Sequence, residues 1–204
     1  MRAGTVGEIR RDSGEWIFVD LGFSRSGRTC GILRGDEDPE AVTFGDLQAR
    51  LLAAAMMSTS PLNLLIEAPL SVAFTQQGNP TGRSFERRAR ATRYWYVGLG
   101  CTIMVAATYL VKALSDAGTC REIRLFEGFV SFKEKGIRSS HTGDVVALRD
   151  VVWHPECHPD AVTPPERLAA KPTDQIRPAF RVLGLETGVP PVVTAKAKPP
   201  FLRR

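Results

Sequence analysis

Two apolar segments that each end on a carboxylate place the strongest constraint on how this chain folds. The run "WIFVD" covers residues 16–20 and ends on Asp20, and the run "LNLLIE" covers residues 62–67 and ends on Glu67. Strands this apolar are typical of a sheet that is covered on both faces. A buried carboxylate is costly unless an arginine, a turn rich in N–H groups or a metal ion pairs with it. The sequence therefore predicts a two-sided sheet whose strand ends carry a polar site.

The remaining segments predict helices and further strands around these two. Thr43 precedes "FGDLQARLLAAAMM" and suits a helix N-cap, and Gly118 is a stop signal for the apolar helix before it. The resulting order of elements predicts an α/β domain, in which a mixed sheet begins with an antiparallel hairpin and is flanked by helices. The predicted strands cover 16–20, 29–34, 62–67 and 120–132. Predicted helices start at Thr43, at Ser84 (running through the arginines) and near Ser140, and a further apolar helix follows the arginines and ends at about Ala117.

Length and composition indicate one globular domain with an appendage. The chain has 204 residues, of which 43% are hydrophobic, so it can bury a sizeable core. Most of the prolines lie from Pro155 onward, which predicts a loop-rich region. We therefore expect a core domain over residues 1–153 and a Pro-rich C-terminal extension over 154–204 that packs on it. The formal net charge of +5 permits a polyanionic partner without requiring one.

Cysteine usage and hydropathy favour a cytoplasmic protein. The four cysteines form no CxxC pair, and Cys30 and Cys101 lie in apolar stretches, so we expect small buried thiols of a reducing compartment. The apolar stretch at 96–114 contains two glycines and a lysine, and we interpret it as a core helix rather than a membrane span.

The segment "HPECH" at 154–158 resembles a zinc-binding sequence, but it has no second Cys/His pair at the spacing that zinc modules require.

Four acidic or imidazole side chains form the candidate site. Asp20 and Glu67 end strands that we expect to be neighbours, and His141 and Asp144 lie three residues apart on one face of a predicted helix. Clustered carboxylates repel each other unless divalent cations lie between them, and oxygen ligands suit Mg²⁺ or Mn²⁺. Two such ions can activate water and stabilise a leaving oxygen during phosphodiester cleavage.

Each of these residues also has a structural alternative. Asp20 could accept hydrogen bonds from the N–H groups of a turn, and Glu67 could pair with an arginine of residues 83–93. Asp144 could stabilise a helix N-terminus through the helix dipole, and His141 could be a cap residue. Glu127, in a predicted strand, could join the site or pair with an arginine such as Arg124.

A basic segment supplies candidate contacts to nucleic acid. The stretch "RSFERRARATR" holds five arginines against one glutamate and is followed by Tyr94, Trp95 and Tyr96. Arginines can bind phosphates and aromatic rings can stack on bases, although such charges often only face solvent. The candidate nucleic-acid-binding residues are Arg83, Arg87, Arg88, Arg90 and Arg93.

Three motifs in this order resemble the RNase H-like superfamily. The segments "FVDLGFSRSGRTCGIL", "LLIEAPLS" and "HTGDVVALRDVV" are similar to those of RuvC-type Holliday-junction resolvases and of predicted bacterial RNase H-fold nucleases. The resemblance covers about residues 15–152 and implies an aspartate on the first strand (Asp20), a glutamate ending the fourth (Glu67) and an H-x-x-D pair on the last core helix (His141, Asp144). Residues 41–45 are short and polar for the third strand that this fold requires.

The resemblance implies that residues 1–153 form a Mg²⁺- or Mn²⁺-dependent nuclease that acts on nucleic acid by a two-metal mechanism, with DNA favoured over RNA. The alternative is a non-catalytic subunit of the same fold that binds nucleic acid or protein. A homodimer or a partner protein fits either function. An actin-like kinase would use "DLGFSRSG" as a phosphate loop, but it needs two such domains, and 204 residues hold one.

Overall fold

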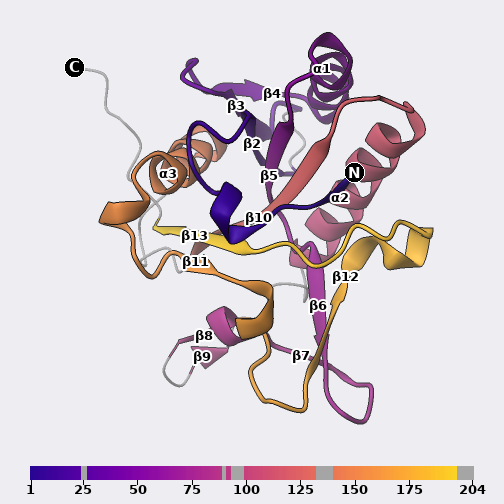
Figure 1. Cartoon of the computed structure of the whole chain (residues 1–204), viewed down its shortest axis with the longest axis vertical. Coiled ribbons are helices and arrows are strands. Elements are labelled where there is room, and N and C mark those ends of the chain that lie inside the picture. Colours follow the sequence, from indigo (N-terminus) through magenta and orange to yellow (C-terminus); the bar gives the residue numbers. More distant parts are fainter. Residues whose placement is uncertain (24–26, 89–90, 93–98, 132–139, 197–204) are drawn as a thin grey trace.

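The chain forms an α/β protein built on a mixed, largely parallel sheet with helices on both faces (Figure 1). The computed structural model describes residues 1–23, 27–88, 91–92, 99–131 and 140–196. Within these residues the α-helices are α1 (Phe44–Met57), α2 (Leu99–Asp116) and α3 (His141–Trp153). Short 3₁₀ helices are η1 (Val6–Glu8), η2 (Ser84–Glu86), η3 (Pro155–Cys157), η4 (Pro165–Arg167) and η5 (Ala179–Leu183).

The main sheet has the strand order β11-β13-β10-β5-β2-β3-β4, and β1 pairs with β10 outside this path. Strands β2, β5, β10 and β13 run parallel, whereas β3, β4 and β11 are antiparallel to their neighbours. The strands are β1 (Arg2–Ala3), β2 (Glu15–Asp20), β3 (Cys30–Arg34), β4 (Glu40–Val42), β5 (Leu62–Glu67), β10 (Ile123–Ser131), β11 (Val162–Thr163) and β13 (Val192–Lys196).

Two smaller sheets are attached to this body. One has the order β12-β6-β7 and the other is the hairpin β8-β9. Their strands are β6 (Ser71–Phe74), β7 (Pro80–Thr81), β8 (Arg87–Arg88), β9 (Ala91–Thr92) and β12 (Gln175–Pro178). Both small sheets lie beyond the end of β5 in Figure 1.

Alternation of side chains along the strands divides the core into two layers. On one face Ile17, Val19 and Leu64 pack against α1 and α2. On the other face Trp16 and Phe18 pack against α3 together with Leu65, Phe126 and Leu148. The sheet is therefore covered on both faces, as the apolar strands predict, and α3 lies on the face opposite to α1 and α2 (Figure 1).

Several sequence predictions are confirmed at the level of elements. Thr43 caps α1 by accepting a hydrogen bond from the Asp46 amide at 3.1 Å. Gly118 adopts a left-handed φ of 62° just after α2 ends, and α3 begins one residue after Ser140. A short third strand, β4, does follow the hairpin, since Glu40–Val42 pairs with Cys30–Ile32 of β3.

Other predictions are wrong. The helix expected from Ser84 through the arginines is a single 3₁₀ turn, η2, followed by the short strands β8 and β9. Cys101 is exposed rather than buried, although Cys30 is buried as expected.

No helix among the described residues is long and apolar enough to cross a membrane.

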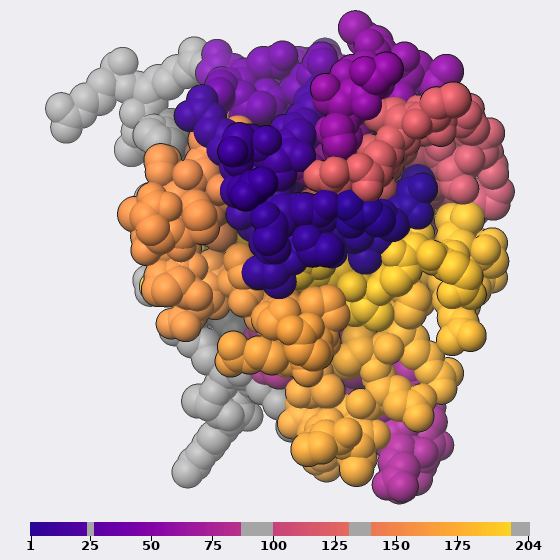
Figure 2. Space-filling view, viewed as in Figure 1, coloured from indigo at the N-terminus to yellow at the C-terminus, as the bar shows by residue number. Residues whose placement is uncertain are grey.

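The region after residue 153 contributes two strands, β11 and β13, to the main sheet. Strand β13 pairs in parallel with β10 from Glu127–Val192 to Ser131–Lys196, and β11 pairs with β13. The N-terminal segment packs beside the C-terminal one, since β1 pairs with β10 and the Ala3 amide donates to the Thr187 carbonyl. Figure 2 shows this indigo segment lying directly beside the yellow C-terminal one. The Pro-rich extension thus contributes strands to the sheet.

A buried arginine ties the helix layer to the start of the central strands. The Arg121 side chain is 1% exposed and pairs with Glu15, the first residue of β2. It also donates to the carbonyl oxygens of Ala54, near the end of α1, and Ser60, just before β5. One guanidinium therefore satisfies acceptors on a helix, a loop and a strand.

Replacing Arg121 with Met should destabilise the fold by about 3 kcal/mol, because it leaves the carbonyl oxygens of Ala54 and Ser60 and one carboxylate oxygen of Glu15 without their donor. The measurement is the urea midpoint of unfolding. Arg10→Met is the control, since the Arg10 side chain is 65% exposed and its removal should cost less than about 0.5 kcal/mol. Equal midpoints for the two variants would contradict this role of Arg121.

Candidate metal centre

Asp20 and Glu67 lie side by side at the carboxyl ends of the two central strands. Strands β2 and β5 are parallel, and their register places Asp20 directly opposite Glu67. Because side chains alternate along a strand, Asp20 shares the face of Trp16 and Phe18, and Glu67 shares that of Leu65. Both carboxylates therefore face the layer of α3, as two neighbouring parallel strands predict.

Helix α3 brings a third carboxylate to the same place. Ser140 caps the helix by accepting from the Gly143 amide at 3.1 Å, which fixes the first turn. Asp144 follows within this turn and is 1% exposed, whereas Val145 and Leu148 fill the core beneath it. One oxygen each of Asp20, Glu67 and Asp144 lies within 4.8 Å of the other two. These three predicted site residues are therefore brought together.

The three oxygens suit a hard divalent cation. Ligand oxygens about 2.0–2.6 Å from one Mg²⁺, Mn²⁺ or Ca²⁺ ion lie within about 5 Å of each other, as these do. Glu67 Oε1 also accepts from the Val130 amide at 3.2 Å, which orients its side chain from the neighbouring strand β10. Carboxylates alone, with no soft ligand among them, favour Mg²⁺ or Mn²⁺ over zinc or copper.

His141 lies beside this group and contacts it through Asp20. Its Nδ1 is 2.7 Å from Asp20 Oδ2, and its side chain is 41% exposed. A carboxylate only accepts hydrogen bonds, so this contact places a proton on Nδ1. The structure therefore puts His141 in contact with a candidate ligand, at the rim of the site, and outside the group of three carboxylates.

Two glycines that the sequence analysis did not single out let α3 approach the sheet. Gly31 of β3 pairs with Asp20, and a Cβ built on it would overlap the backbone carbonyl of His141. A Cβ on Gly22 would overlap the imidazole ring of His141. An isolated glycine inside an apolar strand such as "CGIL" is a sequence signal for this kind of close approach.

Glu127 does not join the site, and its partner is not Arg124. It is fully buried and pairs with Arg83, whose Nη1 lies 2.7 Å from Oε1 and 2.8 Å from Oε2. Glu127 follows Leu125 by two residues, so it faces the layer of α1 and α2 and not that of α3. Burial raises the pKa of its carboxyl group, although the charge of Arg83 opposes this shift.

The arginine segment divides between the core and its hairpin. The expectation that Arg83 contacts nucleic acid is wrong, because its side chain is 0% exposed and pairs with Glu86 and Glu127. Arg87 and Arg88 form β8, which pairs with β9. Arg90 and Arg93 lie outside the described residues. The two histidines of "HPECH" are 3.7 Å from Glu156 and 3.6 Å from Asp150, and they join no candidate metal group in the described part of the chain.

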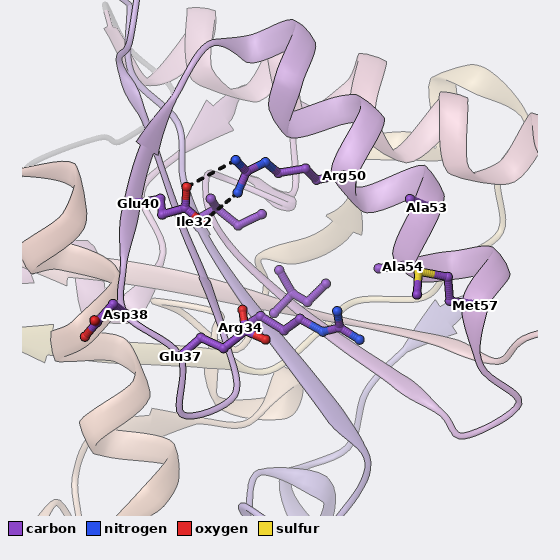
Figure 3. Close-up of a pocket in the computed structure, with 10 residues that line it drawn as sticks. Ile32, Arg34, Glu37, Asp38, Glu40, Arg50, Ala53, Ala54 and Met57 are labelled. Carbon is purple, nitrogen blue, oxygen red and sulfur yellow. Dashed lines mark hydrogen bonds and ion pairs between the residues drawn. The ribbon is translucent and has the colours of Figure 1, made fainter.

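A pocket between α1 and strands β3 and β4 contains none of the site residues (Figure 3). Both of its arginines are already paired with carboxylates, since Arg50 donates to both carboxylate oxygens of Glu40, at 2.8 and 3.1 Å. Arg34 likewise pairs with Glu15 at 2.6 Å. The carboxylate group on the α3 face is therefore the better candidate for chemistry.

Comparison with known proteins identifies no relative. No protein-family model matches the sequence, and searches of curated proteins and of solved structures find no significant match.

Replacing Gly31 with Ala should destabilise the protein by about 1–3 kcal/mol, because the added methyl group meets backbone of α3 that cannot rotate away. Gly45→Ala is the matched control, since it lies in α1 with its nearest neighbouring atom 4.0 Å from the added Cβ. That change should leave stability equal or higher, because Ala favours helix. Urea unfolding of both variants makes the comparison, and an undisturbed Gly31→Ala protein would show that α3 does not rest on β3.

Proposed function

We propose that this protein is a Mg²⁺- or Mn²⁺-dependent nuclease of RNase H-like fold that hydrolyses phosphodiester bonds of nucleic acid. One observation carries the proposal: Asp20, Glu67 and Asp144, from two adjacent strands and the helix above them, offer oxygens within 4.8 Å of one another. Such a group is electrostatically unfavourable without a cation, and its position matches the residues that the sequence resemblance implies.

The arrangement of the first five core strands supports the fold assignment. Counted from β2, the strands β2, β3, β4, β5 and β10 lie in the order 3-2-1-4-5, with the first three antiparallel and the last two parallel to the first. Helix α1 follows the third strand, α2 precedes the fifth and α3 follows it. Strands β13 and β11 extend the sheet beyond the five strands of the resemblance.

The residues have separate roles in this proposal. Asp20, Glu67 and Asp144 would hold the cations, which when bound supply an activated water and stabilise the leaving oxygen. His141 donates a hydrogen bond to Asp20 and so orients that carboxylate. Its partly exposed ring also lies where a proton could pass between the site and solvent.

The proposed substrate is nucleic acid, with DNA favoured through the likeness to junction resolvases. The hairpin β8–β9 starts directly after Glu86, and Arg83 joins Glu86 to Glu127, the residue next to Gly128, which pairs with Glu67. The base of this hairpin is therefore tied through Arg83 to β10, the strand that pairs with Glu67. Arg87, Arg88, Arg90 and Arg93 remain the proposed phosphate contacts.

Removing one ligand charge should abolish cleavage and metal binding while leaving the fold intact. Asp20→Asn, Glu67→Gln and Asp144→Asn should each lose cleavage of labelled DNA, RNA, hybrid and junction substrates, since the site needs several carboxylates. Mg²⁺ should raise the thermal midpoint of the wild type and not of the variants. Without metal, the variants should be as stable as the wild type or more so, because like charges no longer meet.

Asp38→Asn is the control for these variants. Asp38 is an exposed carboxylate in the turn between β3 and β4, at the opposite end of the sheet. It should cleave and respond to Mg²⁺ as the wild type does. A wild-type protein that binds nucleic acid but neither binds metal nor cleaves would instead favour the non-catalytic subunit.

The arginine hairpin can be tested by the salt dependence of binding. Replacing Arg87 and Arg88 with Ala should weaken DNA binding and lower the slope of log K against log salt by about 0.9 for each phosphate that is no longer bound. Arg10→Ala together with Arg11→Ala removes the same charge near residue 36 and should leave the slope unchanged. Equal slopes for both double variants would place the basic surface elsewhere.

A further inference from the structure

We infer that Glu127 and Arg83 are positioning residues that hold the loop after Glu67 and thereby set the metal affinity of the site. The inference rests on the proposed function, because it assigns these residues an effect on the same carboxylates. Its basis is a buried polar network on the opposite face of the sheet from α3. Its members are all 0% exposed: Ser71, Arg83, Glu86 and Glu127.

The network is hydrogen-bonded to the loop that follows β5. Glu127 Oε2 accepts from the Leu70 amide at 2.9 Å, and the Leu70 carbonyl accepts from the Ala179 amide at 2.9 Å. Arg83 Nη1 donates to Ser71 Oγ at 2.9 Å and also to Glu127. The backbone of Leu70, three residues after Glu67, is thus fixed on both sides, and Arg83 fixes the next residue.

Strand β10, which carries Glu127, also holds Glu67 on the face of α3. Glu67 pairs in register with Gly128, the residue after Glu127, and its Oε1 accepts from the Val130 amide at 3.2 Å. Strand β10 therefore contacts the Glu67 side chain on the α3 face and the following loop on the other face. A shift of the loop would move Glu67 relative to Asp20 and Asp144.

The buried charges of the network are better explained by the positioning of the loop after Glu67 than by a contribution to the stability of the fold. Two carboxylates share one guanidinium, since Arg83 Nη2 and Nε donate to Glu86 at 2.8 and 3.2 Å while Nη1 contacts Glu127. Burying such ions costs more than packing apolar side chains of the same size. Directional hydrogen bonds to a backbone amide and a hydroxyl are what the network provides that an apolar cluster could not.

The test is the dissociation constant of Mn²⁺, measured by titration calorimetry on the full-length chain without nucleic acid. Glu127→Leu removes the acceptor for the Leu70 amide but leaves Arg83 paired with Glu86, and should weaken Mn²⁺ binding about 10–100-fold. Glu127→Gln keeps a side-chain oxygen that can accept from Leu70, and should retain most of the affinity. If Glu127→Gln binds Mn²⁺ nearly as well as the wild type and Glu127→Leu does not, the hydrogen bond to the Leu70 amide sets the affinity, and the charge of Glu127 does not.

Arg121→Met is the matched control. It breaks the buried arginine network at the opposite end of the same sheet, so it should lower the urea midpoint without changing Mn²⁺ affinity. If Glu127→Leu does not fold, Ser71→Ala replaces it, since that change removes only the hydroxyl that Arg83 contacts. Ser71→Ala should also weaken Mn²⁺ binding, although less than Glu127→Leu.

The outcomes separate this inference from the proposed function. If the wild type binds Mn²⁺, Asp20→Asn abolishes binding, and the Glu127 and Ser71 variants bind as the wild type, the inference is overturned and the metal site stands. If Arg121→Met weakens binding as much as Glu127→Leu, the effect is general destabilisation and the inference is again overturned. If the wild type binds no Mn²⁺, the proposed function fails, and the inference with it.

Discussion

Mutual repulsion among Asp20, Glu67 and Asp144 is the constraint on which the rest of this structure depends. Two unit charges about 4 Å apart interact by about 4 kcal/mol at an effective dielectric constant of 20, so three ionised carboxylates strongly oppose their own assembly. The fold holds their oxygens within 4.8 Å of each other all the same. The parallel register of β2 and β5 fixes two of them, and the packing of α3 fixes the third.

The pleat of the sheet explains why two glutamates with similar sequence surroundings have different roles. Glu67 ends β5 on the face of α3, where Asp20 and Asp144 meet it. Glu127 lies in β10, one residue before the partner of Glu67, and therefore points to the other face, where Arg83 neutralises it. The sheet thus separates the carboxylates of Asp20, Glu67 and Asp144 from the buried Arg83–Glu86–Glu127 network. A slip of one residue in the register would exchange the two faces.

Local sequence patterns predicted the elements that carry the site. Strands that end on Asp20 and Glu67, and a helix that starts with His141 and Asp144, follow from apolar runs, alternation and helical spacing, which depend on neighbours in the sequence. The α/β class and the helices after Thr43 and Ser140 follow from the same rules. The sequence could also have suggested Gly31, since a glycine inside an apolar strand marks a close approach.

Contacts between distant residues were not predictable in this way. The arginines of residues 83–93 suggested a charged helix, but Arg83 is drawn into the core by Glu127, 44 residues away. The Pro-rich composition after Pro155 indicated loops, whereas Val192–Lys196 completes the sheet because β10 has an edge for it to pair with. Cys101 lies in an apolar stretch, yet it occupies a position of α2 that faces away from the core. Tertiary partners, which no local pattern contains, decided each of these cases.

The most direct test of a metal site at Asp20, Glu67 and Asp144 is the anomalous scattering of Mn²⁺ in crystals of the protein. Diffraction data collected near the manganese absorption edge locate the ion without assuming any ligand. We expect an anomalous peak within bonding distance, about 2.0–2.6 Å, of oxygens of Asp20, Glu67 and Asp144. Crystals grown with saturating Mn²⁺ that show no peak there, and instead a lysine or arginine side chain between the three carboxylates, would contradict this expectation.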